Sequence, residues 1–196
     1  MTAALHPREA LFDPGEPAPP DLPVCDHYAG VEARMRKSLE LQGEMGPVFD
    51  VTLDAEDGAP VGGEIEHGEL IAELVNSPQN SFGRVGARLL PVEHPKFEPL
   101  AELLVNQAGA RLAYLMVPKV RGLADLQRAV DLIDSVPGGH RIPLHALVET
   151  HGALSEVFTL AAHPRIESLS FGLMDFVSAH RGAIPQTGMS VKGQFE

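Results

Sequence analysis

The stretch IPLHALVETHGALSEVFTLAAHPRIESLSFGLMD, residues 142–175, decides the fold class of this chain. It begins with a short apolar run at 142–148 and contains a second at 166–171, and the helical pattern of residues 153–162 separates them. Two strand-like runs joined by a helix are typical of a βαβ unit, whose strands pair in parallel. The stretch therefore predicts an α/β fold.

The same alternation continues toward the N-terminus. Strand-like runs occur at 47–53, 82–85 and 112–117, with a weaker one at 22–25. Helical patterns separate them at 30–42, 64–76, 97–107 and 123–134. This alternation favours a parallel sheet of about six strands but does not distinguish an open sheet from a barrel. In both cases, ligands bind at the carboxyl ends of the strands.

Composition sets the domain organisation and excludes several function classes. Residues 1–23 contain six prolines and no periodicity, so we expect a loose N-terminal arm followed by one domain at 24–196. The single cysteine, Cys25, excludes an intrachain disulfide, and no segment resembles a signal peptide or a membrane span. A net charge of −12 disfavours nucleic-acid binding. These features predict a cytoplasmic protein with neither a nucleic acid nor a membrane as partner.

Charged residues collect where the predicted strands end. They are Asp54, Glu56 and Asp57 after the second strand, Arg84 on the third, Lys119 after the fourth, Glu149 at the end of the fifth and Asp175 after the sixth. Any one of them would be unremarkable at a surface. Together they predict a functional rim, because parallel strands bring their carboxyl ends to one edge of the sheet.

Glu149 and Asp175 are the candidate metal ligands of this rim. If their strands are neighbours, the strands lie about 4.8 Å apart, and two carboxylates so close repel each other unless a cation lies between them. Oxygen donors without cysteine favour Mg²⁺, or Mn²⁺, over Zn²⁺. His145 lies four residues before Glu149, about 13 Å along the strand, and is interpreted as a core or barrel-bottom histidine.

Gly172 and the two residues after it, Leu173 and Met174, are candidate substrate-binding residues. Gly172 opens a tight turn before a predicted helix. Free backbone N–H groups at the start of a helix can hold a carboxylate. Beside a metal site, this turn predicts a clamp for an acidic substrate.

These motifs resemble those of the citrate lyase β-subunit / HpcH–HpaI aldolase family. Residues 53–59 (LDAEDGA) resemble its Leu-Asp-Leu-Glu-Asp-Ala-Val segment, and Arg84-Val85-Gly86 resembles its Val-Arg-Val-Asn strand, with Gly86 in place of Asn. Val117-Pro118-Lys119 resembles its Pro-Lys strand end, Val148-Glu149-Thr150 its Ile-Glu-Thr, and residues 171–175 its Phe-Gly-x-x-Asp. Five motifs occur in the family's order across residues 47–180.

The resemblance implies a fold of the (β/α)8 TIM-barrel type and a Mg²⁺-dependent carbon–carbon lyase. Glu149 and Asp175 would bind Mg²⁺, which chelates a 2-oxo acid, and Arg84 would stabilise the enolate, with Glu56 and Asp57 as further catalytic candidates. Substrates would be thioesters such as citryl-, malyl- or citramalyl-CoA. Homo-oligomers, trimers or hexamers, are expected.

Two alternatives to this function stay open, and the length is one reason. A closed barrel typically needs about 250 residues, so we expect this one to be truncated after about six strands, with the C-terminal strands missing. The first alternative is a CoA-independent class II aldolase acting on a 4-hydroxy-2-oxo acid. The second is a non-catalytic remnant that binds an oxo acid. For Arg84 alone, the competing interpretation is a structural salt bridge with Glu56 or Asp57.

Overall fold

The structure is a computed structural model that describes residues 25–181, 183–190 and 192, so the predicted arm at 1–23 lies outside the described residues. Six parallel strands form one sheet in the order β1-β2-β3-β4-β5-β6. They are β1 (Asp26–Ala29), β2 (Asp50–Asp54), β3 (Val85–Arg88), β4 (Leu115–Val117), β5 (Leu144–Val148) and β6 (Ile166–Phe171). The predicted α/β fold with six parallel strands is confirmed, as a half-barrel.

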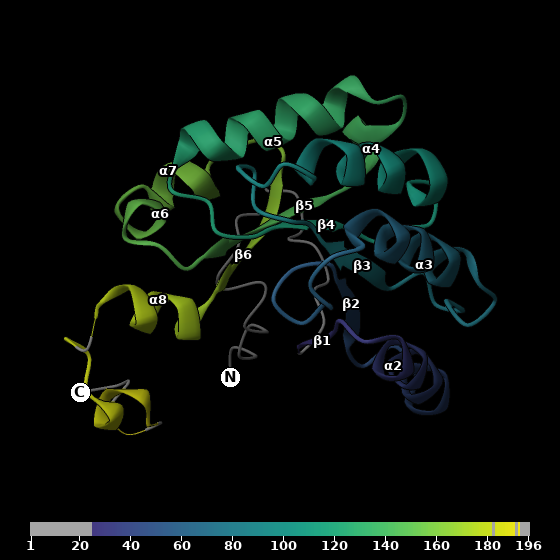
Figure 1. Cartoon of the computed structure of the whole chain (residues 1–196), viewed down its shortest axis with the longest axis horizontal. Helices are drawn as coiled ribbons and strands as arrows, with labels where there is room; N and C mark the ends of the chain where they lie inside the picture. The colour runs from purple at the N-terminus through teal and green to yellow at the C-terminus, as the bar shows by residue number, and fades with distance from the viewer. Residues whose placement is uncertain (1–24, 182, 191, 193–196) are drawn as a thin grey trace, which may run out of the picture.

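Helices connect the strands and cover one face of the sheet. They are α2 (Glu32–Met45), α3 (Glu64–Asn76), α4 (Phe97–Ala108), α5 (Leu123–Ser135), α6 (His151–Ser155), α7 (Val157–Ala161) and α8 (Leu173–Ala179), with the short η1 (Gly139–Arg141) and η2 (Gln186–Met189). Figure 1 shows α2 to α5 in an arc outside the sheet, whereas α8 follows the end of β6. Among the described residues, no helix is long and apolar enough to cross a membrane.

One predicted helix is wrong. The structure divides the single helix expected at 153–162 into α6 and α7, which meet at Glu156. The Thr150 hydroxyl accepts a hydrogen bond from the Ala153 N–H, so it caps α6 two residues earlier than predicted. The Glu156 carboxylate, although exposed, accepts a hydrogen bond from the Leu123 N–H, which ties the junction to the start of α5.

The two faces of the sheet differ in chemistry. Alternate strand residues such as Val51, Leu53 and Ala87 are fully buried against the helices and form the main core. The opposite, concave face carries polar groups. His145 is 3% exposed, stacks on Tyr114 with 4.0 Å between ring centroids, and hydrogen-bonds Glu167. His145 is therefore buried on the concave face, away from the rim, which agrees with the second of its two interpretations, a barrel-bottom histidine.

The third strand lies three residues later than predicted, at 85–88 instead of 82–85. Gly83 has a positive φ of 64°, which is incompatible with a strand, so the chain becomes extended only after it. Val85 and Ala87 face the core, while Gly86 lies against the Tyr114 ring, where a Cβ would come within 2.3 Å of a ring carbon. Arg88, rather than Arg84, therefore ends this strand.

The outer strands β1 and β6 lead to a prediction about assembly. Neither has a second strand partner among the described residues, and Phe171 at the end of β6 is 54% exposed. Unpaired backbone groups beside exposed apolar side chains favour association. We expect light scattering at micromolar concentration to give a mass above that of the 21.0 kDa chain. A stable monomer would contradict the predicted self-association.

Candidate active site

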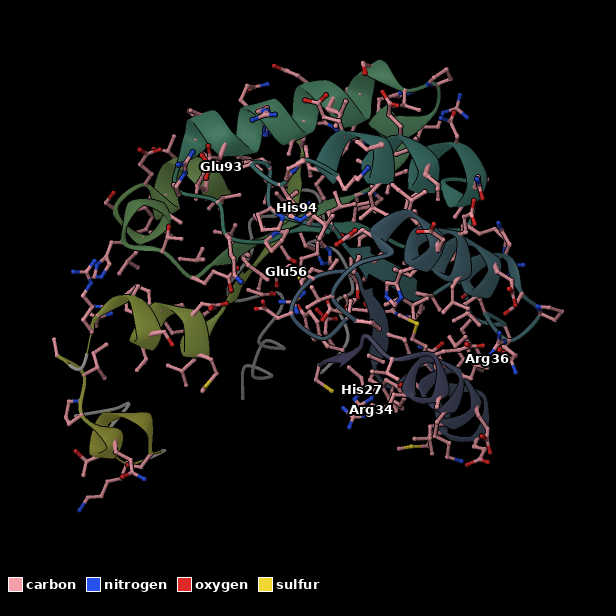
Figure 2. All side chains as sticks on the ribbon, viewed as in Figure 1. His27, Arg34, Arg36, Glu56, Glu93 and His94 are labelled. Atoms are coloured by element: carbon pink, nitrogen blue, oxygen red, sulfur yellow. The ribbon has the colours of Figure 1, made fainter. Side chains whose placement is uncertain are left out.

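The carboxyl ends of β2 to β6 bring most of the predicted site residues together. Glu56 and Asp57 follow β2, Lys119 follows β4, Glu149 follows β5 and Asp175 lies in the first turn of α8. Lys119 contacts all four of the other residues, so they form one connected rim. Figure 2 shows Glu56 near the middle of the molecule, whereas Arg36 on α2 lies at its periphery.

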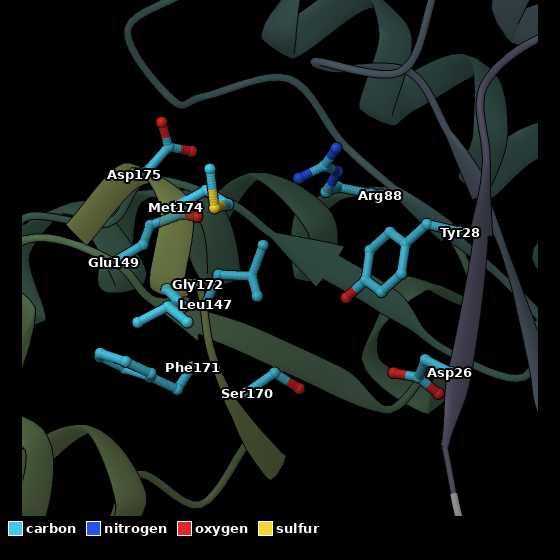
Figure 3. A pocket seen from close by; sticks show the side chains of 11 residues that line it. Asp26, Tyr28, Arg88, Leu147, Glu149, Ser170, Phe171, Gly172, Met174 and Asp175 are labelled. Atoms are coloured by element: carbon cyan, nitrogen blue, oxygen red, sulfur yellow. The ribbon is translucent and has the colours of Figure 1, made fainter. Parts of the chain in front are cut away.

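A cavity of about 440 Å³ opens beside this rim. Its lining residues are Asp26, Tyr28, Arg88, Leu147, Glu149, Ser170, Phe171, Gly172, Leu173, Met174 and Asp175. In Figure 3, Arg88 and Tyr28 lie on one side, and Glu149, Met174 and Asp175 lie on the other. A substrate in this cavity would lie between a fixed cation and a pair of carboxylates.

Arg88 is held rigidly in the cavity wall by Asp54. Its Nε and Nη2 donate to the two Asp54 carboxylate oxygens at 2.7 and 2.6 Å, and Asp54 is 2% exposed. The backbone N–H groups of Glu56 and Gly58 also donate to Asp54, so each of its carboxylate oxygens accepts two hydrogen bonds. The Tyr28 ring lies 5.2 Å from the guanidinium carbon. This packing fixes one positive charge at the cavity.

Glu149 is the most perturbed carboxylate of the site. It is 3% exposed, and its Oε1 accepts a 2.6 Å hydrogen bond from the Lys119 N–H. Burial raises the pKa of Glu149 to about 7, and the charges of Asp175 and Glu56 act in the same direction. A divalent cation next to Glu149 would favour its charged form and offset the free-energy cost of burying a carboxylate charge.

Glu149 and Asp175 fit a magnesium ion by their chemistry. Both line the main cavity and a second one of about 330 Å³, and neither is accompanied by a cysteine or histidine donor there. Among the described residues, no three His, Cys, Asp or Glu side chains converge into a metal cage. Mg²⁺ is usually bound through one or two carboxylates, with water and substrate supplying the other oxygens. Two carboxylates are therefore sufficient.

The predicted substrate clamp lines the same cavity. Gly172 caps α8, and Leu173 and Met174 form its first turn, where backbone N–H groups lack intrahelical acceptors. Gly172 is needed for close approach, because a Cβ at this position would lie 2.2 Å from the Glu149 Oε2. The turn after β6 and the carboxylate after β5 are therefore packed directly against each other.

Gly172→Ala is expected to weaken Mg²⁺ binding by displacing Glu149, and to lower the midpoint of thermal unfolding. Calorimetric Mg²⁺ titration and circular dichroism measure the two effects. Gly43→Ala on α2 is the matched control, since its added Cβ would meet nothing within 4 Å apart from the adjacent backbone of its own helix. The control should be neutral or slightly stabilising, because Ala favours a helix over Gly. Equal Mg²⁺ affinity in Gly172→Ala and wild type would contradict this packing argument.

Glu56 and Asp57 differ in their surroundings. The Glu56 side chain is buried, and burial raises its pKa despite ion pairs with Lys119 and Arg88 at 2.5 and 3.2 Å. Asp57 is more exposed. Burial also acts to raise its pKa, but hydrogen bonds with Lys119 and Glu56 outweigh burial and lower it. Both side chains are therefore anchored to cations of the rim.

The placement predicted for Arg84 is wrong. Its Nε donates to Asp50 Oδ1 at 2.6 Å, and Asp50 begins β2, at the end of the sheet opposite the rim. Its salt bridge is structural in kind, but the partner is Asp50 and not Glu56 or Asp57. Arg88 is the site residue that sequence reasoning missed.

Strand alternation puts Arg84 and Arg88 on the same face of the strand, so by itself it could not single out Arg88. Val85 and Ala87 are apolar and face the helices, which places Gly86 and Arg88 on the concave face. Tyr28 and Asp26 were also missed, because β1 is a four-residue strand with little apolar pattern. No sequence signal identified the cavity floor, which Asp26 and Ser170 help to form.

Comparisons with known proteins show what the whole chain is similar to. No family model matches the chain. A citrate lyase from Burkholderia xenovorans LB400 is 50% identical, with a TM-score of 0.86 over 98% of this chain and 60% of its own. The resemblance to citrate lyase-like proteins is confirmed, since the chain is similar to this citrate lyase over almost all of its own residues. A curated relative, L-malyl-CoA/β-methylmalyl-CoA lyase of Cereibacter sphaeroides, is 25% identical over 84% of this chain and 52% of its own length.

A more distant solved structure shares the fold of this citrate lyase-like chain. It is the citrate lyase β-subunit of M. tuberculosis complexed with oxaloacetate and magnesium, which is 18% identical, with a TM-score of 0.62 over 83% of this chain and 64% of its own. The citrate lyase-like chain spans about half the length of the curated relatives it matches.

Proposed function

We propose that this chain carries the catalytic rim of a Mg²⁺-dependent carbon–carbon lyase. The reaction would cleave a hydroxyacyl-CoA of the citryl-, malyl- or citramalyl-CoA type into an acyl-CoA and a 2-oxo acid. The observation that carries the proposal is one cavity with Asp54-anchored Arg88 on one side and Glu149 with Asp175 on the other. The kinship with citrate lyase and malyl-CoA lyase supports it.

The electron balance of the reaction explains why charge is needed on both sides. The substrate hydroxyl loses its proton, its carbon becomes the carbonyl of the 2-oxo acid, and the electron pair of the broken carbon–carbon bond passes to the thioester as an enolate. The enolate then takes up a proton to give the acyl-CoA. Negative charge therefore appears on oxygen during cleavage, and fixed positive charge at that position lowers the barrier.

Each described rim residue has a role in this proposal. The Arg88 guanidinium, held in place by Asp54, faces the developing negative charge. Glu149 and Asp175 hold Mg²⁺, which when bound polarises the oxygens of the 2-oxo acid. The first-turn N–H groups of Leu173 and Met174 hold a substrate carboxylate. Glu56 and Asp57 stay candidates for proton handling through their contacts with Lys119 and Arg88.

The edge of the cavity favours a thioester over a small free acid. Phe171 and Met174 line it and are 54% and 70% exposed. A short hydroxy-oxo acid is polar throughout and would gain little from these side chains. A CoA thioester continues into a long, partly apolar arm that can cover them, which gives favourable apolar burial.

The proposal is tested by product release. The protein is incubated with malyl-, citramalyl- or citryl-CoA and Mg²⁺, and glyoxylate, pyruvate or oxaloacetate is measured together with acetyl-CoA. We expect one thioester to be cleaved and EDTA to abolish the reaction. Cleavage of a free 4-hydroxy-2-oxo acid without CoA would favour the aldolase. Binding of an oxo acid without any cleavage would favour the non-catalytic alternative.

A further inference from the structure

Lys119 connects parts of the rim that come from three separate segments of the chain. Its Nζ lies 2.5 Å from Glu56 Oε1, 3.0 Å from Asp57 Oδ1 and 3.6 Å from Asp175 Oδ2. Its backbone N–H donates to Glu149 Oε1 at 2.6 Å. One residue after β4 therefore contacts carboxylates that follow β2, β5 and β6.

The backbone of Lys119 is held in an uncommon conformation. Its φ is 51°, in the left-handed region, and within the described residues only Arg181 is another non-glycine with positive φ. Glycine adopts this conformation without steric cost, so a side chain at such a position carries a penalty. The conformation directs the Lys119 N–H to Glu149 while the side chain reaches the other three carboxylates. A glycine would keep the first contact and lose the others.

The charge balance around Lys119 explains why an ammonium lies there. Glu56, Asp57, Asp175 and Glu149 gather four carboxylates, and Arg88 is the other cation in contact with this group among the described residues. Without Lys119, mutual repulsion would push these carboxylates apart or keep them protonated. The contact with Asp175 is the longest of the three and the weakest.

We propose that Lys119 is a positioning residue that serves as an internal counter-ion: it orders the rim without metal and gives up its contact with Asp175 when a divalent cation binds. Glu56 and Asp57 retain the ammonium in both states, so it moves only away from Asp175. The inference rests on the proposed Mg²⁺ site. It predicts that Lys119 weakens Mg²⁺ binding and at the same time stabilises the rim of the metal-free protein.

The two effects of Lys119 have opposite signs, and this makes the proposal testable. In Lys119→Met, the metal-free protein should unfold at a lower temperature because the carboxylates repel each other. The same variant should bind Mg²⁺ roughly tenfold more tightly, because a positive charge no longer repels the ion at close range. Lys119→Arg keeps the charge and should keep the wild-type Mg²⁺ affinity. Calorimetric titration with Mg²⁺ alone and unfolding in EDTA measure both quantities.

The matched control is Lys37→Met, which removes an exposed lysine of α2 whose Nζ contacts Glu40. It should change neither quantity. If Lys119→Met lowers stability and weakens Mg²⁺ binding together, Lys119 is only a structural support and the proposal is overturned. Unchanged affinity, or no Mg²⁺ binding by the wild type, also overturns it. Lys119→Gln, which removes the charge but keeps a hydrogen-bond donor, replaces Lys119→Met if the latter does not fold.

Turnover is measured separately on the same proteins. A wild type that binds Mg²⁺ but cleaves no thioester would contradict the proposed function and leave the affinity comparison intact. If the wild type cleaves a thioester but Lys119→Met binds Mg²⁺ with the affinity of the wild type, the proposed function is supported and the proposed role of Lys119 is contradicted.

Discussion

Arg88→Lys is expected to reduce turnover of the cleaved thioester by roughly 10²–10³-fold, the usual effect of removing one preorganised stabiliser of an oxyanion. The reason is geometric. Arg88 uses Nε and Nη2 for both oxygens of Asp54, which fixes the plane of the guanidinium at the cavity. A lysine ammonium is a point charge without a planar fork, so it can pair with Asp54 or face the substrate but not do both.

Arg84→Lys is the matched comparison, because it makes the same chemical change at the opposite end of the sheet. Lysine can still reach Asp50 there, and we expect turnover close to that of the wild type. Circular dichroism of both variants checks that they fold, since Asp54 is buried and a weakened partner costs stability. If Arg88→Lys is active and Arg84→Lys is inactive, the prediction is wrong and Arg84 is the catalytic arginine.

Glu149→Gln is expected to abolish Mg²⁺ binding and to stabilise the metal-free protein above pH 7. An amide is a weak magnesium ligand, so calorimetric titration should show no binding. The gain in stability follows from burial: the charged carboxylate is costly where Glu149 lies, and burial raises its pKa to about 7. Glutamine has a similar shape without the charge.

The sign of the pH effect follows from proton linkage. Between the ordinary glutamate pKa of 4.5 and about 7, the folded protein holds a proton on Glu149 that the unfolded chain has released. The free energy of unfolding therefore falls as the pH rises through this window, by about 3 kcal/mol in all from this group. Stability from Glu149 is complete below pH 4.5 and lost above pH 7. Urea unfolding at pH 5 and pH 8 in EDTA measures it.

Asp175→Asn separates metal binding from burial. Asp175 has a 37% exposed side chain, so its replacement should remove Mg²⁺ binding without the gain in stability at pH 8. If Glu149→Gln is no more stable than wild type at pH 8, the cost of its burial has been overestimated. If both variants bind Mg²⁺ as the wild type does, these residues are not the metal ligands.

The sequence by itself determined the order of the elements and the set of carboxylates at the rim. Apolar runs alternating with amphipathic helices required a parallel sheet, and a parallel sheet brings every carboxyl end to one edge. Glu149 and Asp175 could be placed together for this reason, since Glu149 directly follows one well-patterned strand and Asp175 lies four residues after the next. Helix α3 was predicted with its observed bounds, because its apolar residues recur at helical spacing.

Only the tertiary structure decided which arginine faces the cavity and what Lys119 connects. Residues 84 and 88 lie on the same face of the strand, so alternation cannot distinguish them, yet they lie about 13 Å apart along it. The short strand β3 contains glycine and alanine, whose weak apolar signal leaves its register open until it pairs with β2 and β4. Lys119 contacts four carboxylates because the segments after β2, β5 and β6 converge around it, and convergence of distant segments is set by packing and not by local sequence.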